Sequence, residues 1–74
     1  MGREIRIGDR VKLDWELFKR EYPAIYIGYR KFETSCWFIV KAIREFDLQV
    51  QNIDMKTVYF INTECFYKPF NQLT

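Results

Sequence analysis

The segment at residues 36–53 constrains the fold most strongly, because it has the pattern of two long strands folded back on each other. Apolar and polar residues alternate from Phe46 to Gln51, the period of two that is typical of a strand with one solvent-facing side. Residues 37–43 are apolar at nearly every position, which indicates a central strand covered on both faces. In that strand we expect two opposite faces, formed by Phe38, Val40 and Ala42 and by Trp37, Ile39 and Ile43.

The connection between these two strands, at residues 45–47, contains no Gly, Asn or Pro. Tight two-residue hairpin turns depend on those residue types. The sequence therefore argues against a tight turn and leaves a longer or bulged connection open.

A one-sided strand precedes the hairpin. Gly8 and Asp9 predict a turn, after which Val11 and Leu13 alternate with basic residues. This alternation indicates a strand with one face in the core.

The period changes at residues 14–22, where we predict a helix. Trp15, Phe18 and Tyr22 have the i, i+3, i+7 spacing of one helical face. Asp14 can cap the start of the helix, and Pro23 disfavours helical geometry at the preceding residue and so ends it. We expect this short helix to cover one open end of the sheet.

Three further segments complete the pattern. Residues 24–32 predict a strand with a bend at Gly28, and residues 57–61 predict another strand. Asn62 can cap a single helical turn at residues 62–64. The last strand contains Pro69, which is acceptable only at a sheet edge.

This order of elements predicts a mainly β protein: a small barrel of five to six strands with one short helix, at about residues 14–22, after the first main strand. The 74 residues allow one domain, residues 1–74, with one core. A composition that is 49% hydrophobic and 19% aromatic can fill such a core in spite of its small size.

Three segments resemble the SH3-like barrels of the KOW and Tudor kind. Residues 8–13 (GDRVKL) look like the opening strand of that family, residues 37–40 (WFIV) like its central strand, and residues 66–69 (FYKP) like its last strand after a short helical turn. The predicted helix lies where such barrels carry a variable first loop. The resemblance implies an SH3-like barrel that binds peptides, other proteins or nucleic acids and is rarely catalytic.

Enzymatic chemistry is not expected from this composition. There is no histidine, the most common general base, and the two cysteines, Cys36 and Cys65, stand alone in the sequence. Their wide separation does not fit a metal site, so we expect no cofactor or metal. We expect two reduced thiols in the core, with a disulfide as the alternative. The charged start MGREIRIGDR and the lack of a long apolar run predict a cytoplasmic protein without a membrane segment.

Binding is the remaining class of function, and two versions of it stay open. Aromatic side chains beside Arg and Lys on a sheet face can stack bases and hold phosphates. The same residue types also anchor protein interfaces. The candidate binding residues are Tyr26, Arg30, Lys31, Trp37, Lys41, Arg44 and Tyr59.

A protein partner is the favoured version, with direct nucleic-acid binding as the alternative. The 12 basic and 10 acidic residues alternate along the chain, so no basic block points to nucleic acid. Fourteen aromatic residues in 74 exceed what one small core can hide, so we expect an exposed patch. Self-association through an edge strand is a further way to cover that patch. The expected protein is an adaptor, small subunit or inhibitor that occupies a partner's surface.

Overall fold

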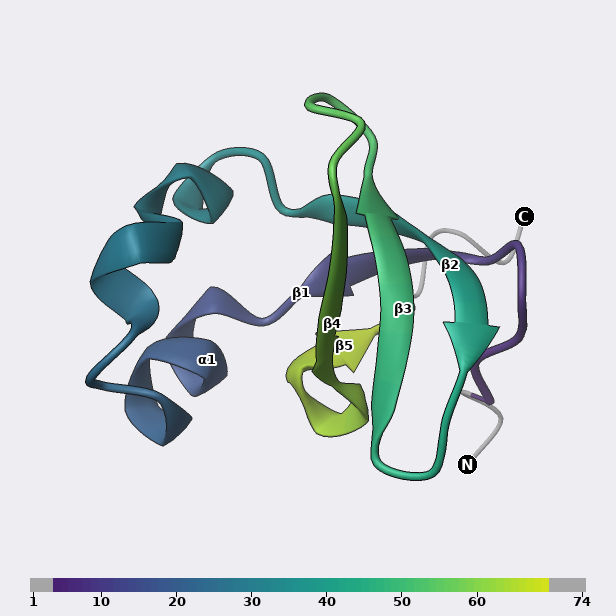
Figure 1. Cartoon of the computed structure of the whole chain (residues 1–74), viewed down its shortest axis with the longest axis horizontal. Helices are drawn as coiled ribbons and strands as arrows, with labels where there is room; N and C mark the ends of the chain where they lie inside the picture. Colours follow the sequence, from purple (N-terminus) through teal and green to yellow (C-terminus); the bar gives the residue numbers. More distant parts are fainter. Residues whose placement is uncertain (1–3, 70–74) are drawn as a thin grey trace.

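Five antiparallel strands form one sheet in the computed structural model, which describes residues 4–69. They are β1 (Arg10–Leu13), β2 (Trp37–Ile43), β3 (Asp47–Asn52), β4 (Val58–Asn62) and β5 (Phe66–Tyr67). Their order in the sheet is β4-β3-β2-β1-β5, so β4 and β5 are the two edges (Figure 1).

The mainly β class and the count of five strands agree with the prediction, but the sheet is open. Within residues 4–69, β4 pairs only with β3 and β5 only with β1. β5 has two residues and is closely followed by Pro69, which has no N–H for a further ladder bond. The sheet therefore does not close into the predicted barrel.

The β2–β3 hairpin confirms the pairing predicted for residues 36–53. Val40 pairs with Val50 but Ala42 pairs with Gln49, so Lys41 is an extra residue in a β-bulge. Arg44 closes the connection, because its N–H donates to the Asp47 carbonyl oxygen at 2.9 Å. The predicted alternation fails beyond the bulge: Ala42 leaves the face of Phe38 and Val40, since a bulge shifts the phase of the strand.

The core lies on one face of the sheet and follows the period of two along each strand. Val11, Val40 and Val50 are fully buried there, as are Phe38 and Leu48. The other buried apolar residues are Leu13, Phe18, Phe32, Ile61, Cys65 and Phe66. The opposite, outer face carries the alternate residues of every strand.

The helix α1 (Trp15–Glu21) confirms the prediction for residues 14–22. Asp14 is its N-cap, and the Asp14 carboxylate accepts a hydrogen bond from the Leu17 N–H at 3.2 Å. Phe18 is buried, and the Tyr22 N–H donates to the Phe18 carbonyl oxygen at 2.9 Å at the C-terminal end.

The strand predicted at residues 24–32 is wrong. Residues Tyr26–Glu33 form the 3₁₀ helix η1, which packs with α1 beside the sheet (Figure 1). η1 consists of two short helical pieces joined at a kink at Tyr29, where φ is −116° and ψ is 19°. A spacing of three residues suits such turns, and Tyr26, Tyr29 and Phe32 all lie toward the core side. Tyr26 contacts Trp15, Tyr29 contacts Phe18 and Phe32 contacts Phe38, with ring centroids 6.1, 5.6 and 5.0 Å apart. Gly28 is consequently part of a helix and not a bend in a strand.

The C-terminal elements follow the prediction. Asn62 caps the helical turn η2 (Thr63–Cys65), and its side-chain oxygen accepts from the Glu64 N–H at 2.9 Å. β5 then pairs with β1 at the sheet edge.

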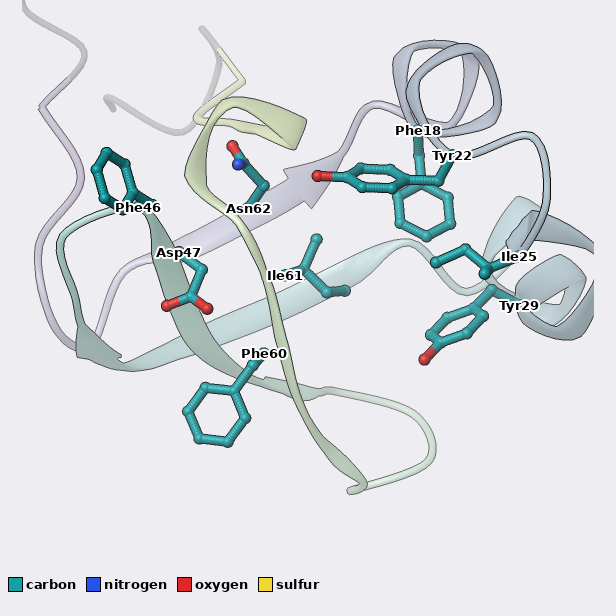
Figure 2. Close-up of a pocket in the computed structure, with 9 residues that line it drawn as sticks. All are labelled: Phe18, Tyr22, Ile25, Tyr29, Phe46, Asp47, Phe60, Ile61 and Asn62. Carbon is teal, nitrogen blue, oxygen red and sulfur yellow. The ribbon is translucent and has the colours of Figure 1, made fainter.

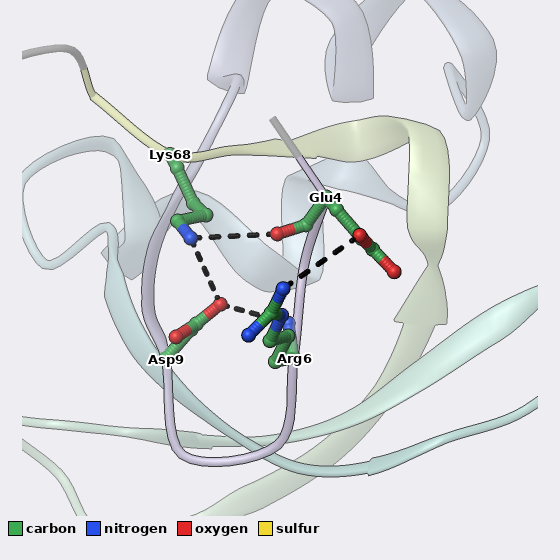
Figure 3. A network of polar contacts seen from close by, with 4 residues as sticks. All are labelled: Glu4, Arg6, Asp9 and Lys68. Carbon is green, nitrogen blue, oxygen red and sulfur yellow. Dashed lines mark hydrogen bonds and ion pairs between the residues drawn. The ribbon is translucent and has the colours of Figure 1, made fainter. Parts of the chain in front are cut away.

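A polar network joins the segment before β1 to Lys68, which follows β5 (Figure 3). Gly8, at φ +95°, forms the predicted turn before β1. Within the turn the Asp9 carboxylate accepts from the Arg6 N–H at 2.7 Å and pairs with the Lys68 ammonium at 3.1 Å. Lys68 also donates to the Glu4 carbonyl oxygen at 3.4 Å. The segment before β1 is thereby fastened to the residues after β5.

Candidate binding groove at the β4 edge

A groove of about 270 Å³ runs over the edge strand β4 and gathers several exposed apolar side chains. Phe46 is 73% exposed, Phe60 53% and Ile25 49%, although each belongs to a different segment of the chain. The groove is lined by Phe18, Tyr22, Ile25, Tyr29, Phe46, Asp47, Phe60, Ile61 and Asn62 (Figure 2). Apolar side chains concentrated in this way are typical of an interaction surface.

The floor of the groove is the open edge of β4. The Asn52 N–H donates to the Thr57 carbonyl oxygen and the Thr63 N–H to the Phe46 carbonyl oxygen. Hydrogen-bonded residues alternate along an antiparallel strand. The backbone N–H and C=O groups of Val58 and Phe60 therefore point away from β3, toward a side where no strand lies within residues 4–69.

Two apolar walls flank this edge. Figure 2 shows Phe46, Asp47 and Phe60 to one side of β4, and Tyr22, Ile25 and Tyr29 to the other. The first wall comes from the β2–β3 connection and from the outer face of β4. The second comes from α1, η1 and the residues between them, so the wrongly predicted segment at residues 24–32 supplies half of the groove.

Charge at the first wall is locally balanced. The Arg44 guanidinium lies 4.3 Å from the centre of the Phe60 ring, where it makes a cation–π contact. It also pairs with the Asp47 carboxylate at 2.7 Å, and this ion pair raises the pKa of Arg44. The wall therefore presents a neutralised ion pair next to an aromatic ring.

Tyr22 and Asn62 stand together at one end of the groove (Figure 2). Burial, and then the nearby Cys65, Glu64 and Glu21, raise the pKa of Tyr22, while its hydrogen bond with the Asn62 side chain opposes this rise. The phenol keeps its proton at neutral pH, so this end offers neutral polar groups.

The structure does not bring the predicted site residues onto one face. Tyr26 and Arg30 lie on η1, and Tyr26 packs half-buried against Trp15. Tyr59 faces the core side of β4, where the Lys31 ammonium lies 5.7 Å from its ring centre. The other predicted residues lie on β2 and the connection that follows it: Trp37, Lys41 and Arg44.

Trp37 instead belongs to the outer face of the sheet. It pairs with Lys12, and both the Lys12 ammonium and the Arg10 guanidinium lie near its ring, at 5.8 and 5.7 Å from the centre. Tyr67 pairs with Lys12 from the other side. The alternation of basic residues with Val11 and Leu13 was the sequence signal for this cluster.

The groove residues are not among the binding residues that the sequence predicts. The sequence assigns Ile25 to a strand, and it places Tyr22 on a helix that offers, with Leu17 and Phe18, only a second possible surface for a partner. Phe46 and Phe60 carried a sequence signal, because each is a large apolar residue at a position that a polar residue usually occupies. Phe46 lies at a turn, and Phe60 lies on the solvent-facing phase of a strand. The other wall of the groove depends on η1.

Burial, followed by the charges of Glu64, Glu21 and Asp14, raises the pKa of the Cys65 thiol to about 11. Cys65 thus stays protonated at neutral pH, which is unfavourable for a nucleophile. Both Cys36 and Cys65 are free thiols, and residues 4–69 contain no cluster of three or more metal-ligating side chains.

Comparisons with known proteins found no family model, curated protein or solved structure that matches this chain. Among residues 4–69, we find no helix with the length and apolar character that a membrane crossing requires.

Proposed function

We propose that this protein is a non-enzymatic binding module whose groove at the β4 edge holds a segment of a protein partner. The observation that carries the proposal is the gathering of Ile25, Phe46 and Phe60, which are distant in sequence, around one groove. Burying such side chains against a partner contributes about 25 cal/mol per Å² of apolar surface. An adaptor, small subunit or inhibitor acts in this way.

The arrangement of strands supports assigning the fold to the SH3-like class. β1 follows the Gly8-Asp9 turn, β2 is central, and β5 follows a single helical turn, as in the resemblance described above. In this assignment α1 and η1 together replace the variable first loop, and the sheet remains open between β4 and β5. Binding is the usual role of that class.

A matched pair of variants tests the groove. Ile25 and Ile27 are both exposed isoleucines in neighbouring positions, but only Ile25 lines the groove. Linear peptides that bind the native protein are first selected from a random display library. We expect these peptides to bind the Ile27→Glu variant as tightly as they bind the native protein. The same peptides should bind Ile25→Glu at least about tenfold more weakly, because a buried carboxylate faces an apolar ligand.

Far-UV circular dichroism would establish that both variants remain folded. The proposal fails if no peptide is enriched on the native protein, or if the two variants bind the selected peptides equally well.

The outer face of the sheet favours a second candidate function, binding of single-stranded nucleic acid. Arg10 and Lys12 flank Trp37 there. Among the paired strand residues whose side chains lie on this face, Asp47 is acidic, and Arg44 neutralises its charge. A basic, aromatic sheet face can stack bases and bind phosphates.

An amide NMR titration with a mixed-sequence single-stranded 12-mer tests this candidate. We expect shifts at Arg10, Lys12 and Trp37 that weaken steeply as salt rises, and loss of binding in Trp37→Ala. Lack of shifts on this face at low salt would eliminate it.

A further inference from the structure

The two edges of the sheet differ in how well they resist pairing with another chain. Natural edge strands are protected by being short or by carrying Lys, Pro or a bulge. β5 has two residues and is followed by Lys68 and Pro69. β4 has five uncharged residues, VYFIN, in an unbroken register with β3. Among residues 4–69, β4 is thus the unprotected edge, and the backbone groups of Val58 and Phe60 point away from β3.

The two walls of the groove lie on the two sides of β4 toward which an added strand would direct its side chains. Successive side chains of a strand point to opposite faces. A strand placed beside β4 would direct one set of side chains at Tyr22, Ile25 and Tyr29, and the other set at Phe46 and Phe60 (Figure 2). Both walls are largely apolar, so apolar side chains fit on both faces of the added strand.

A single extended segment fits this position better than a second copy of the protein. Antiparallel pairing of two β4 strands would bring the α1–η1 wall of each copy to the same side of the joined sheet. Both walls would then compete for the space beside the same short edge. A peptide without flanking structure has no such conflict.

Charge around β4 indicates the direction of the added strand. Lys31 lies beside Tyr59 of β4. Lys56 precedes Thr57, whose carbonyl oxygen accepts a hydrogen bond from the Asn52 N–H at the start of the β3–β4 pairing. Both lysines are exposed, and neither makes an ion pair within residues 4–69. Asp54, which is also exposed, lies in the same turn as Lys56, so the two lysines leave a net positive charge at the end where β4 begins. The exposed Glu64 lies beyond the other end of β4.

We infer that the groove takes an extended peptide segment, which adds to β4 as a sixth, antiparallel strand with apolar residues against both walls and acidic residues after them, next to Lys31 and Lys56. Antiparallel pairing matches the rest of the sheet and places the C-terminal part of the peptide at the start of β4. This inference rests on the proposed function and specifies the partner's chemistry.

Two synthetic peptides of equal composition test the inference: acetyl-Gly-Val-Ile-Val-Glu-Glu-amide and its reversed sequence, acetyl-Glu-Glu-Val-Ile-Val-Gly-amide. We expect the first to bind about fivefold more tightly, the size of effect that two exposed ion pairs supply. Lys31→Gln combined with Lys56→Gln should remove this preference. Lys41→Gln, an exposed lysine of the β2 bulge, should leave it unchanged.

Backbone pairing is tested by hydrogen exchange and by N-methylation of the peptide. Saturation with the first peptide should slow exchange of the Val58 and Phe60 amides, whereas the Tyr59 and Ile61 amides already pair with β3. In an added strand only alternate peptide amides face β4. Methylation of those amides should weaken binding about tenfold and methylation of the others should have little effect.

Three results would overturn strand addition. The first is no binding of the forward peptide at millimolar concentration, and the second is binding without protection of Val58 and Phe60. The third is protection of those amides that rises with protein concentration in the absence of peptide, which would identify a second copy as the occupant. If the library peptides still distinguish Ile25→Glu from Ile27→Glu, the proposed function survives any of these results.

Discussion

At the scale of single residues, Asn52 shows how one buried polar side chain organises two segments. It is fully buried at the end of β3, on the phase of the strand that faces the core. Its side-chain N–H donates to the Ser35 carbonyl oxygen at 2.8 Å, and its side-chain oxygen accepts from the Asp54 and Met55 N–H groups at 3.0 and 2.9 Å. The residue thus holds the β3–β4 turn and the approach to β2 together.

Asn52→Ala should lower the free energy of unfolding by about 2–3 kcal/mol, because it removes three part-buried hydrogen bonds and leaves a gap where the buried amide was. Urea denaturation measures this change. Gln49→Ala, on the outer face of the same strand, should change stability by less than about 0.5 kcal/mol. Equal effects of the two substitutions would show that the Asn52 hydrogen bonds contribute nothing to stability.

At the scale of elements, η1 shows how a segment can satisfy two periodicities. Residues 24–32 alternate well enough for a strand, yet Tyr26, Tyr29 and Phe32 are also spaced by three. The rings of Trp15 and Phe18 on α1 provide the contacts that favour the second pattern. A helical segment leaves Ile25 and Ile27 exposed, and Ile25 becomes part of a groove wall.

Two glycines allow a paired prediction about the backbone of these elements. A Cβ at Gly28 or at Gly8 would meet no atom within 4 Å, but only Gly8 has a positive φ, of +95°. Gly28→Ala should therefore stabilise the protein by about 0.4–1 kcal/mol, since alanine restricts the unfolded chain. Gly8→Ala should destabilise it by about 1 kcal/mol or more.

Thermal denaturation of the two glycine variants measures both changes. A loss of stability in Gly28→Ala would mean that η1 needs backbone freedom that alanine lacks.

At the scale of the whole molecule, folding sorts charges that alternate along the chain. The period of two places Arg10 and Lys12 on the outer face, whereas acidic residues such as Asp9 and Glu64 lie in turns at the ends of strands. The half-buried Asp9–Lys68 pair joins the segment before β1 to the residues after β5. The environment of the Asp9 carboxyl group also makes the stability of the fold depend on pH.

Burial alone would raise the pKa of Asp9, but the hydrogen bonds from the Arg6 N–H and from Lys68 lower it below its ordinary value of 3.8. A carboxyl group whose pKa is lower in the folded state stabilises the fold above its unfolded pKa. That contribution is lost as the pH falls through the folded pKa.

At pH 7, Asp9→Asn should therefore lower the free energy of unfolding, measured by urea denaturation, by about 1 kcal/mol. The difference should shrink below about pH 4. Asp54→Asn, which alters an exposed acid of the β3–β4 turn, serves as the control. A difference that is constant between pH 7 and pH 3 would contradict the role given to the ion pair.

Local patterns in the sequence determined much of the fold. Alternation predicted β3 and the core face of β1, and a continuous apolar run predicted β2, because both patterns reflect the geometry of a single strand. The outer face of β2 is less buried than that run predicted. Asp14 and Asn62 predicted the starts of α1 and η2, because capping involves residues only a few positions apart. Such signals need no knowledge of distant segments.

Only the tertiary structure decided the conformation of η1, the openness of the sheet and the position of the groove. Tyr26 and Tyr29 pack as part of a helix against α1, and β4 is an edge because within residues 4–69 it pairs only with β3. The groove combines Phe46, Phe60 and Ile25 from three separate segments. These features depend on contacts between residues far apart in the chain, which local periodicity does not encode.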